Sequence, residues 1–425
     1  MKTLKYESRG PEVELLQLGL TRAGTEPGPI DGIFGGRTLV SLQRFQQSSG
    51  LDPDGIFGPK SKNALLPYLR GYTRHEAVRG DSFFRLAKTY STTPEAIAAA
   101  NPGIPAKNVP LGQMLIIPFG FKVVPKGVSY TYCLSELVLD GLKARYPFLR
   151  GGSLGRSVMG KRLSYLRIGS GPREVFYNAA HHANEWITSP LLASFAEDYA
   201  IAILSHGDLC GHSAQSLFSR TTLFLAPMID PDGVDLVTGA LDSGPFYDRA
   251  LEIAGGFPEI PFPQGWKANI QGTDLNLNYP AGWERAKEIK FEKGFTSPAP
   301  RDYVGTAPLS APESAAVAAF TRYRDFSLTV SLHTQGQVIY WQYGDIEVPS
   351  AYEIGLRFAA ASGYALEDTP YESSFAGYKD WFIQDFTRPG YTVEAGLGTN
   401  PLPISDLPGI FDRVKPILAL GLELA

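Results

Sequence analysis

Two adjacent histidines precede a glutamate in the stretch NAAHHANEWITS, residues 178–189, in a chain with only six histidines. An imidazole and a carboxylate this close along the chain can bind one metal ion from a single turn. His182 and Glu185 form His-x-x-Glu, whereas His181 pairs with Glu185 at i,i+4 spacing only in a helix. Because the stretch follows a β-rich run, we favour a turn here, and therefore His182 over His181.

Four apolar, β-rich segments of the chain end on polar side chains. EVFYNAA leads into His182, LFLAPMI into Asp230, SLTVSL into His333 and GYTV into Glu394. In open α/β sheets, ligands bind beyond the carboxyl ends of the strands, so these side chains are expected at one shared site. His182, Glu185 and His333, with a fourth position left open, are the ligand set of a catalytic zinc site. The pattern predicts one zinc ion per chain.

The elements that must position this site occupy the second part of the chain. At 425 residues, two or three domains are expected. After residue 120, short β-rich runs alternate with helical patterns at 134–145, 190–204 and 312–324, which predicts an α/β sheet covered on both faces. We therefore assign residues 121–425 to a catalytic domain.

The composition excludes several classes of protein. A net charge of −4 gives no electrostatic footprint for nucleic acid or an anionic membrane, and two cysteines make no disulfide framework. No run of 18 apolar residues predicts a transmembrane helix. The first residues, MKTLKYESRGPEVELL, lack the apolar core of a signal peptide, so we expect synthesis in the cytoplasm.

An internal repeat marks the first domain, residues 1–71. IDGIFGGRTLVSLQRFQ, from Ile30, is echoed by PDGIFGPKSKNALLPYL, from Pro53. Each copy has an Asp-Gly turn and a second glycine before a helical pattern, and with the helix PEVELLQLGLTRAG they predict a three-helix unit. DGIFG together with LQRFQ resembles the peptidoglycan-binding domain found beside wall hydrolases. A packing repeat without a ligand is the alternative.

The second domain, residues 72–120, is predicted to fold as β-α-α-β. Ser82 and Thr93 are suitable N-caps for its two helices, and short apolar runs flank them. The Gly-Asp turn, Asn-Pro and LGQMLIIP resemble a LysM module, a fold that holds N-acetylglucosamine in chitin or peptidoglycan. The resemblance implies a shallow glycan groove between two loops, formed by Gly80, Asp81, Ser82, Asn101, Pro102 and Ile104. The alternative reading of these residues is as turn formers and caps.

Residues 122–425 resemble the zinc carboxypeptidases of the carboxypeptidase A type. The pieces that carry the resemblance are HHANEW, DPDGV, GTDLNLNYP, APLSAPES, SLHTQG and GYKDW. It implies a mixed eight-stranded sheet with helices on both faces, zinc bound by His182, Glu185 and His333, and Glu394 as the general base. The resemblance also implies three supporting roles. Asp274 would be the carboxylate that orients the first histidine, Lys267 would stabilise the oxyanion, and Tyr371 would be the mobile tyrosine over the substrate.

One motif departs from this family. Its exopeptidases carry Asp-x-Asn-Arg-Asn, whose arginine clamps the C-terminal carboxylate of the substrate, but this chain reads Asp274-Leu-Asn276-Leu277-Asn. An Arg–carboxylate pair is strong and geometrically specific, and a buried carboxylate without a partner is costly. Loss of the clamp leaves the zinc chemistry untouched and favours an endopeptidase, or an enzyme with an unusual residue after the cleaved bond.

Lys379 indicates which kind of residue follows the cleaved bond. It precedes Asp380-Trp381, the family position at the base of the pocket for the residue after the cleaved bond, and a lysine there favours a carboxylate-bearing side chain. A solvated surface lysine is the alternative. In peptidoglycan stems, meso-diaminopimelate carries a second carboxylate and follows γ-D-glutamate. The whole chain resembles the bacterial γ-D-glutamyl-diamino-acid endopeptidases, which share DLN and YPAGWE without the arginine.

We therefore expect a monomeric zinc peptidase that is anchored to peptidoglycan and cleaves the γ-D-glutamyl–diamino acid bond at the cell wall or in spore peptidoglycan. Two other functions remain open: a conventional zinc carboxypeptidase tethered to the wall, and a wall-binding protein with an inactive enzyme-like domain. The presence of all four residues His182, Glu185, His333 and Glu394 argues against the inactive protein.

Overall fold

A computed structural model describes residues 2–425, which divide into two compact units. Residues 2–129 group with 136–150, and residues 130–135 group with 151–425. None of the helices in the described residues combines the length and apolar character needed to cross a membrane.

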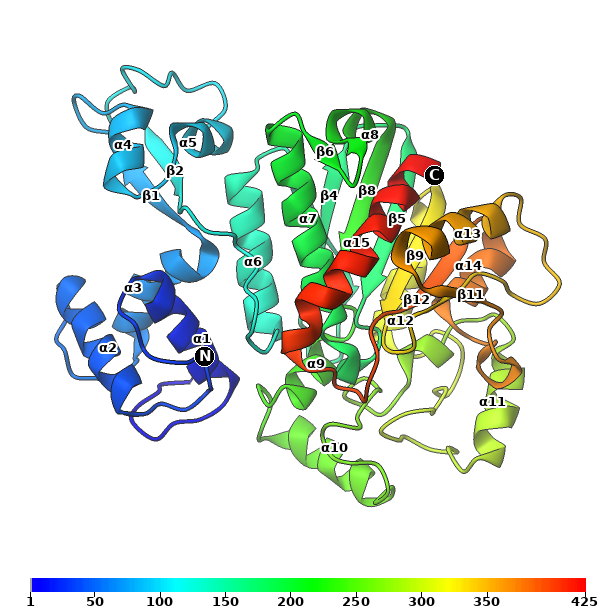
Figure 1. The fold of residues 1–425 in the computed structure, drawn as a ribbon. Helices are drawn as coiled ribbons and strands as arrows, with labels where there is room; N and C mark the ends of the chain where they lie inside the picture. The colour runs from blue at the N-terminus through cyan, green and yellow to red at the C-terminus, as the bar shows by residue number, and fades with distance from the viewer. Residues whose placement is uncertain (1) are drawn as a thin grey trace. The chain divides into compact units, whose positions relative to one another are not determined.

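The first unit begins with the three-helix module, coloured blue in Figure 1. Its helices are α1 (Pro11–Arg22), α2 (Gly36–Ser48) and α3 (Pro59–Arg70). The two copies of the repeat are held by equivalent buried glutamines. Gln17 Nε2 donates to Asp31 Oδ1 at 2.9 Å, and Gln46 Nε2 donates to Asp54 Oδ1 at 2.8 Å. In both copies the glutamine Oε1 accepts from the N–H of the glycine after the aspartate, so the Asp-Gly turn is fixed at both ends.

The β-α-α-β module follows and confirms the predicted order. Its elements are β1 (Tyr72–Glu76), α4 (Phe83–Thr89), α5 (Pro94–Ala100) and β2 (Met114–Pro118), and the two strands pair antiparallel. Both predicted caps are formed, because the Ser82 hydroxyl accepts from Arg85 N at 3.2 Å and the Thr93 hydroxyl accepts from Ala96 N at 3.1 Å. Helix α6 (Tyr132–Arg145) comes next in the chain.

The second unit is built on an eight-stranded mixed sheet, as predicted. The strand order is β11-β10-β12-β9-β5-β8-β4-β3. The strands are β3 (Arg150–Arg156), β4 (Arg162–Gly169), β5 (Arg173–Ala179), β8 (Thr221–Ala226), β9 (Phe326–His333), β10 (Val338–Tyr340), β11 (Ala365–Glu367) and β12 (Gly390–Glu394). The central strands β8, β5, β9 and β12 are parallel, so their carboxyl ends meet at one edge of the sheet.

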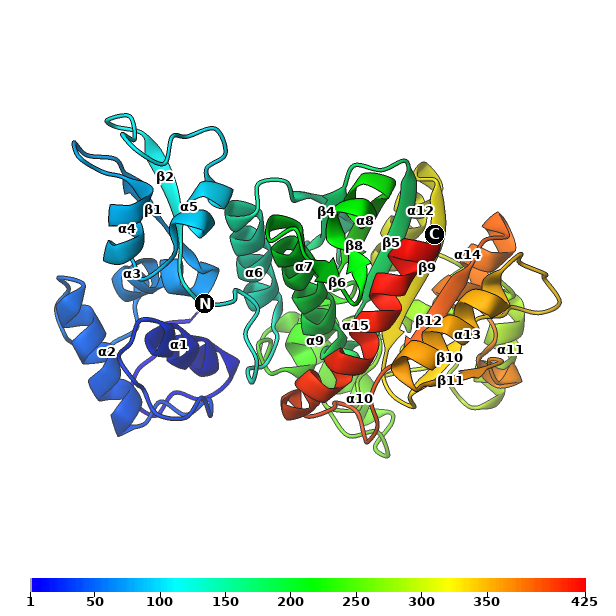
Figure 2. The same cartoon turned by 45° about the horizontal axis from the view of Figure 1, so that its top comes forward.

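Helices cover both faces of the sheet, as Figures 1 and 2 show. Successive residues of β5 point to opposite faces. Phe176 packs in a core with residues of α12 and α14, whereas the hydroxyl of Tyr177 donates to Leu418 O of α15 at 2.7 Å and its ring contacts Phe195 of α7. These helices are α7 (Thr188–Leu204), α12 (Pro312–Tyr323), α13 (Ala351–Ser362), α14 (Tyr378–Phe386) and α15 (Leu407–Leu424). The other elements are β6 (Asp208–Leu209), β7 (His212–Ser213), α8 (Ala214–Arg220), α9 (Pro231–Val237), α10 (Pro245–Gly255) and α11 (Trp283–Glu292).

Candidate metal and active site

Three side chains converge where strands β5 and β9 end. The ligand atoms of His182, Glu185 and His333 lie within 4.8 Å of one another, and all three residues are buried. The two Nδ1 atoms are 3.2 Å apart, His182 Nδ1 lies 2.9 Å from Glu185 Oε1, and His333 Nδ1 lies 2.9 Å from Glu185 Oε2. Two nitrogens and one carboxylate therefore face a common point.

The turn after β5 places the first two of these groups. Residues Ala183–Glu185 form a single 3-10 turn, not an α-helix, which brings the side chains of His182 and Glu185 to the same side. The Thr188 hydroxyl ties this turn to the strand end, because it donates to Glu185 O at 2.7 Å and accepts from Ala180 N at 3.0 Å. His181 points elsewhere: its Nε2 lies 2.9 Å from the hydroxyl of Tyr279.

The donor set fits a zinc ion in number, type and spacing. Zinc–nitrogen bonds of about 2.0–2.1 Å in a tetrahedron place two nitrogens roughly 3.3 Å apart, close to the observed separation. Asp274 Oδ1 lies 3.1 Å from His182 Nε2, so a proton held there leaves the Nδ1 lone pair directed at the cluster. Although burial lowers the pKa of His182, the carboxylates of Glu185 and Asp274 together outweigh burial and raise that pKa to about 9. A metal ion bound here would displace this proton.

Lys267 and Glu394 approach the cluster from other segments. Lys267 Nζ lies 2.9 Å from Glu185 Oε1. Although burial lowers the pKa of this ammonium, the Glu185 carboxylate raises it above the usual value. Glu394, the last residue of β12, pairs in register with His333. Burial raises the pKa of the Glu394 carboxyl, against the opposing effect of His333, which makes this carboxylate a better proton acceptor.

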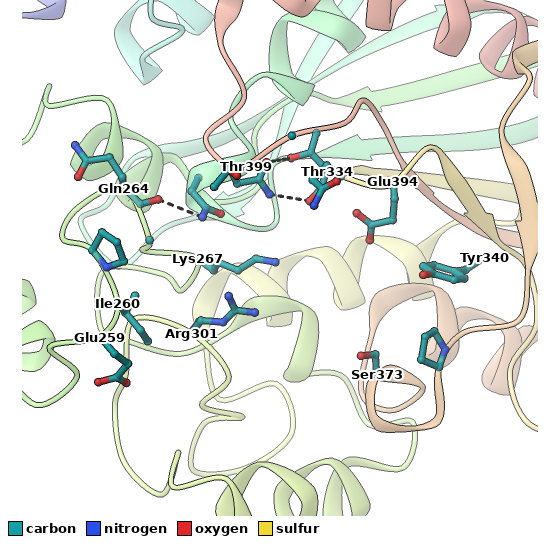
Figure 3. A pocket seen from close by; sticks show the side chains of 17 residues that line it. Glu259, Ile260, Gln264, Lys267, Arg301, Thr334, Tyr340, Ser373, Glu394 and Thr399 are labelled. Carbon is teal, nitrogen blue, oxygen red and sulfur yellow. Dashed lines mark hydrogen bonds between the residues drawn. The ribbon is translucent and has the colours of Figure 1, made fainter.

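Two adjoining cavities open beside the cluster. The larger cavity, of about 610 Å³, is lined by residues that include Asn184, Gln264, Thr334, Gln335 and Asn400. The smaller cavity, of about 190 Å³, is lined by residues that include Asn276, Leu277, Lys379 and Asp380. Lys267, Arg301, Tyr340, Ser373 and Glu394 line both. Figure 3 shows Lys267 and Arg301 on one side of the larger cavity, across from Glu394 and Tyr340.

Family comparisons agree with this geometry. Residues 136–408 match the zinc carboxypeptidase family, which is more than half of the chain. The chain belongs to that family. Residues 9–65 match a putative peptidoglycan binding domain and residues 75–118 match the LysM domain, so this zinc carboxypeptidase family member carries two modules that indicate peptidoglycan binding.

Individual proteins similar to this one fall into three kinds. Gamma-D-glutamyl-L-diamino acid endopeptidase 1 from Lysinibacillus sphaericus is 42% identical over 299 residues, 70% of this chain and 73% of that protein. The spore cortex-lytic enzyme of Bacillus subtilis (strain 168) is 33% identical over 104 residues, 23% of this chain and 34% of that protein. The structure of carboxypeptidase A from Helicoverpa armigera has a TM-score of 0.51 at 19% identity, covering 69% of this chain and 74% of that chain, and so shares the fold.

Leucine lines the smaller cavity at the motif position where exopeptidases of this family have arginine. Leu277 is buried and packs in an apolar cluster with Trp283, Ala286, Val304 and Ala376. An apolar side chain here offers no hydrogen bond to a carboxylate. Any anion in the smaller cavity must therefore be met by another group.

Lys379 and Asp380 form a buried ion pair in the wall of the smaller cavity. Lys379 Nζ lies 2.5 Å from Asp380 Oδ1 and donates to Gln342 O at 2.5 Å. Both side chains are 4% exposed, so Lys379 is not a solvated surface residue. Asn276 fixes the start of α14, which carries both, because its Oδ1 accepts from Tyr378 N at 3.0 Å.

Tyr371 lies outside both cavities. It is 63% exposed, and its hydroxyl accepts from Arg285 Nε at 3.2 Å. It lines a separate hollow with residues that include Tyr343, Asp368 and Phe375. The neighbouring Pro370 and Ser373 reach the larger cavity instead.

The predicted glycan-binding residues divide into two groups. Gly80, Asp81 and Ser82 line a cavity of about 500 Å³ together with residues that include Lys107, Val109 and Leu111. Asn101 is buried and holds the module together, because its amide donates to Ile97 O and Ile116 O, both at 2.7 Å. Ile104 packs against the core of the module, and Pro102 is exposed.

Several cavity-lining residues were not assigned a role from the sequence. Thr334 and Gln335 follow His333 directly, so their position next to a predicted ligand was the available signal. Asn184 lies between His182 and Glu185 and had the same signal. Arg301 and Tyr340 lie in segments without such a neighbour, and sequence reasoning did not select them.

Proposed function

We propose that this protein is a zinc-dependent peptidoglycan hydrolase that cleaves the bond between γ-D-glutamate and a diamino acid in stem peptides. The observation that carries this proposal is Leu277 in the smaller cavity, where exopeptidases of this family have a carboxylate-binding arginine. The two wall-binding modules and the name of the 42% identical relative support the same substrate.

In this proposal His182, Glu185 and His333 hold one zinc ion, which when bound acidifies a water molecule and polarises the scissile carbonyl. The Glu394 carboxylate accepts a proton from the attacking water and returns it to the leaving amine nitrogen. Lys267 Nζ, beside Glu185, donates to the carbonyl oxygen as negative charge develops on it. Asp274 keeps the ring of His182 oriented by accepting from its Nε2.

The smaller cavity is proposed to receive the diamino acid, with Asn276 and Leu277 in its wall and Tyr371 closing over the bound substrate. The distal end of meso-diaminopimelate carries both an ammonium and a carboxylate. Lys379 and Asp380 present the opposite charges side by side, which supports binding of this end: the carboxylate at Lys379 and the ammonium at Asp380. A substrate with only one of these charges leaves one buried partner unmatched.

The modules are proposed to hold the enzyme on its substrate. The cavity at Gly80, Asp81 and Ser82 is the candidate glycan site of the LysM module, with Asn101, Pro102 and Ile104 maintaining the adjoining loop. Tethering raises the local concentration of stem peptides without changing the active site. The spore cortex-lytic relative supports spore peptidoglycan as one place of action.

Digestion of defined peptides tests this function. The zinc-loaded full chain is incubated with L-Ala-γ-D-Glu-meso-diaminopimelate and, separately, with ordinary peptides that end in a free carboxylate, and mass spectrometry identifies the new termini. We expect release of diaminopimelate from the stem peptide and slow release of C-terminal residues from the ordinary peptides. Fast release of those residues, with the stem peptide left intact, would instead identify a wall-tethered carboxypeptidase.

A further inference from the structure

Arg301 lies at the junction of the two cavities and takes no part in the proposed zinc binding or catalysis. It lines both the larger and the smaller cavity, from the loop between α11 and α12. Figure 3 shows its guanidinium close to the Lys267 side chain, on the side of the cavity across from Glu394. The charges of Lys267 and Arg301 are close enough to interact, so this junction holds two cations.

Arg301 has two donor nitrogens that no role in the proposed function uses. Lys267 is bound to Glu185, whereas Arg301 uses only its Nε, which donates to Asp302 Oδ2 at 2.6 Å. Within residues 2–425, its two terminal nitrogens form no hydrogen bond or ion pair. Asp302 is itself fixed, by Lys290 Nζ at 2.5 Å and by donation of its own N–H to Asp274 Oδ2 at 3.1 Å. The guanidinium is therefore anchored at one nitrogen and open at the other two.

The substrate of the proposed function carries an anion close to the cleaved bond, and the inference rests on that function. In a γ-D-glutamyl bond the scissile carbonyl belongs to the side chain, so the residue keeps a free α-carboxylate. Three carbons, and so four bonds of about 1.5 Å, separate the two groups, and in an extended chain with tetrahedral angles the carboxylate carbon lies about 5 Å from the reacting carbon. An ordinary peptide bond has a carboxylate at this separation only where glutamate precedes the bond. A planar guanidinium binds a carboxylate through two parallel hydrogen bonds.

We propose that Arg301 binds the α-carboxylate of the γ-D-glutamyl residue and so selects γ-linked glutamate with a free α-carboxylate. Leu277 and the Lys379–Asp380 pair lie in the smaller cavity, on the side of the diamino acid. Arg301 also reaches the larger cavity, which is left for the glutamyl residue and the chain before it. One anion on each side of the cleaved bond is then met by a different cation.

A pair of substrates that differ in one group tests this assignment. The zinc-loaded full chain is assayed on L-Ala-γ-D-Glu-meso-diaminopimelate and on the same peptide with the glutamyl α-carboxylate converted to an amide. We expect kcat/KM of the wild type to favour the free acid by about ten- to hundredfold, the range of a charge-assisted hydrogen bond. Arg301→Gln should lose this preference through a fall on the free acid alone, and Arg301→Lys should keep part of it. Arg249→Gln, an exposed arginine paired with Glu252, is the matched control and should keep the full preference.

The substrate pair separates recognition from damage to the site. An equal fall of Arg301→Gln on both substrates would overturn the inference, because a disturbed Asp302 affects both alike. An unchanged preference in Arg301→Gln would overturn it as well. If the wild type and Arg301→Gln cleave both peptides equally well, only the inference fails. If the wild type cleaves neither peptide, the proposed function fails first and the inference with it.

Discussion

The two ends of this chain are held together by contacts of different range along the sequence. In the three-helix module, Gln46 contacts Asp54, Gly55 and Ile56, all within ten residues, and Gln17 makes the equivalent contact with Asp31, 14 residues away. In the peptidase unit, His182 meets Asp274 at a separation of 92 residues and His333 at 151. The three-helix module, which is held by local contacts, depends on single turns, whereas the metal site, which is built from distant strands, depends on the whole sheet. Damage to one should therefore leave the other working.

The largest expected effect is loss of the metal. His333→Ala removes one of three ligands, so most of the zinc and all measurable hydrolysis should be lost. Metal analysis of the purified variant measures this directly. His206→Ala, at an exposed position after α7, should keep one zinc per chain. Full zinc occupancy in His333→Ala would mean that the ion is held elsewhere.

The next effect separates chemistry from metal binding. Glu394→Gln keeps the size of the side chain but removes the proton acceptor, so kcat should fall by about 10²–10⁴ with zinc content and KM almost unchanged. Glu353→Gln, on the exposed side of α13, is the control. Near-normal turnover in Glu394→Gln would assign the base to another carboxylate.

A smaller effect is expected on substrate choice. Lys379→Met removes the positive half of the buried pair with Asp380, so meso-diaminopimelate substrates should lose about ten- to hundredfold in kcat/KM. Otherwise identical lysine substrates, which keep an ammonium for Asp380, should lose much less. Equal losses on the two substrates would show that Lys379 supports the fold of the pocket and does not bind the distal carboxylate.

The contrast between local and distant contacts also explains what the sequence revealed. The helix caps at Ser82 and Thr93 and the alternation of strands and helices are local, and both were confirmed. The metal cluster was predictable although its members are far apart, because parallel strands bring their carboxyl ends to one edge. Arg301 lies in an irregular loop, and no periodicity relates it to that edge.

Side-chain pairing was the part that the sequence could not supply. Lys379 was predicted to lie at the base of a pocket, but its partner Gln342 O depends on how α14 meets the loop after β10. Asn101 was selected for a glycan loop, and its amide in fact bonds to backbone carbonyls of the module. In both residues the polar group bonds to a backbone carbonyl at least 15 residues away, Ile116 O or Gln342 O, which leaves no pattern in the sequence.

A local effect should appear in the three-helix module. Gln46→Ala leaves the N–H of Gly55 without its partner and removes one of two donors to Asp54 Oδ1, which should lower the free energy of unfolding of the module by about 1–3 kcal/mol. Hydrogen exchange at Gly55 measures this, with the exposed Gln47→Ala as control. Hydrolysis of soluble stem peptides should stay unchanged, and a matching loss there would show that the module and the metal site are coupled.

The smallest expected effect concerns attachment to the wall. Leu111 lines the cavity at Gly80–Ser82 and is 77% exposed, so it offers an apolar face to a bound sugar. Leu111→Glu should weaken co-sedimentation with insoluble peptidoglycan by about three- to tenfold, because partial burial of a leucine contributes less than its full 1.5–3 kcal/mol. The three-helix module remains as a second attachment point, which keeps the loss partial. Leu251→Glu, at an exposed position in α10 of the peptidase unit, is the matched control and should bind as the wild type does. Unchanged binding of Leu111→Glu would move the glycan site away from this cavity, whereas slower cleavage of small soluble peptides would show that the module contributes to catalysis itself.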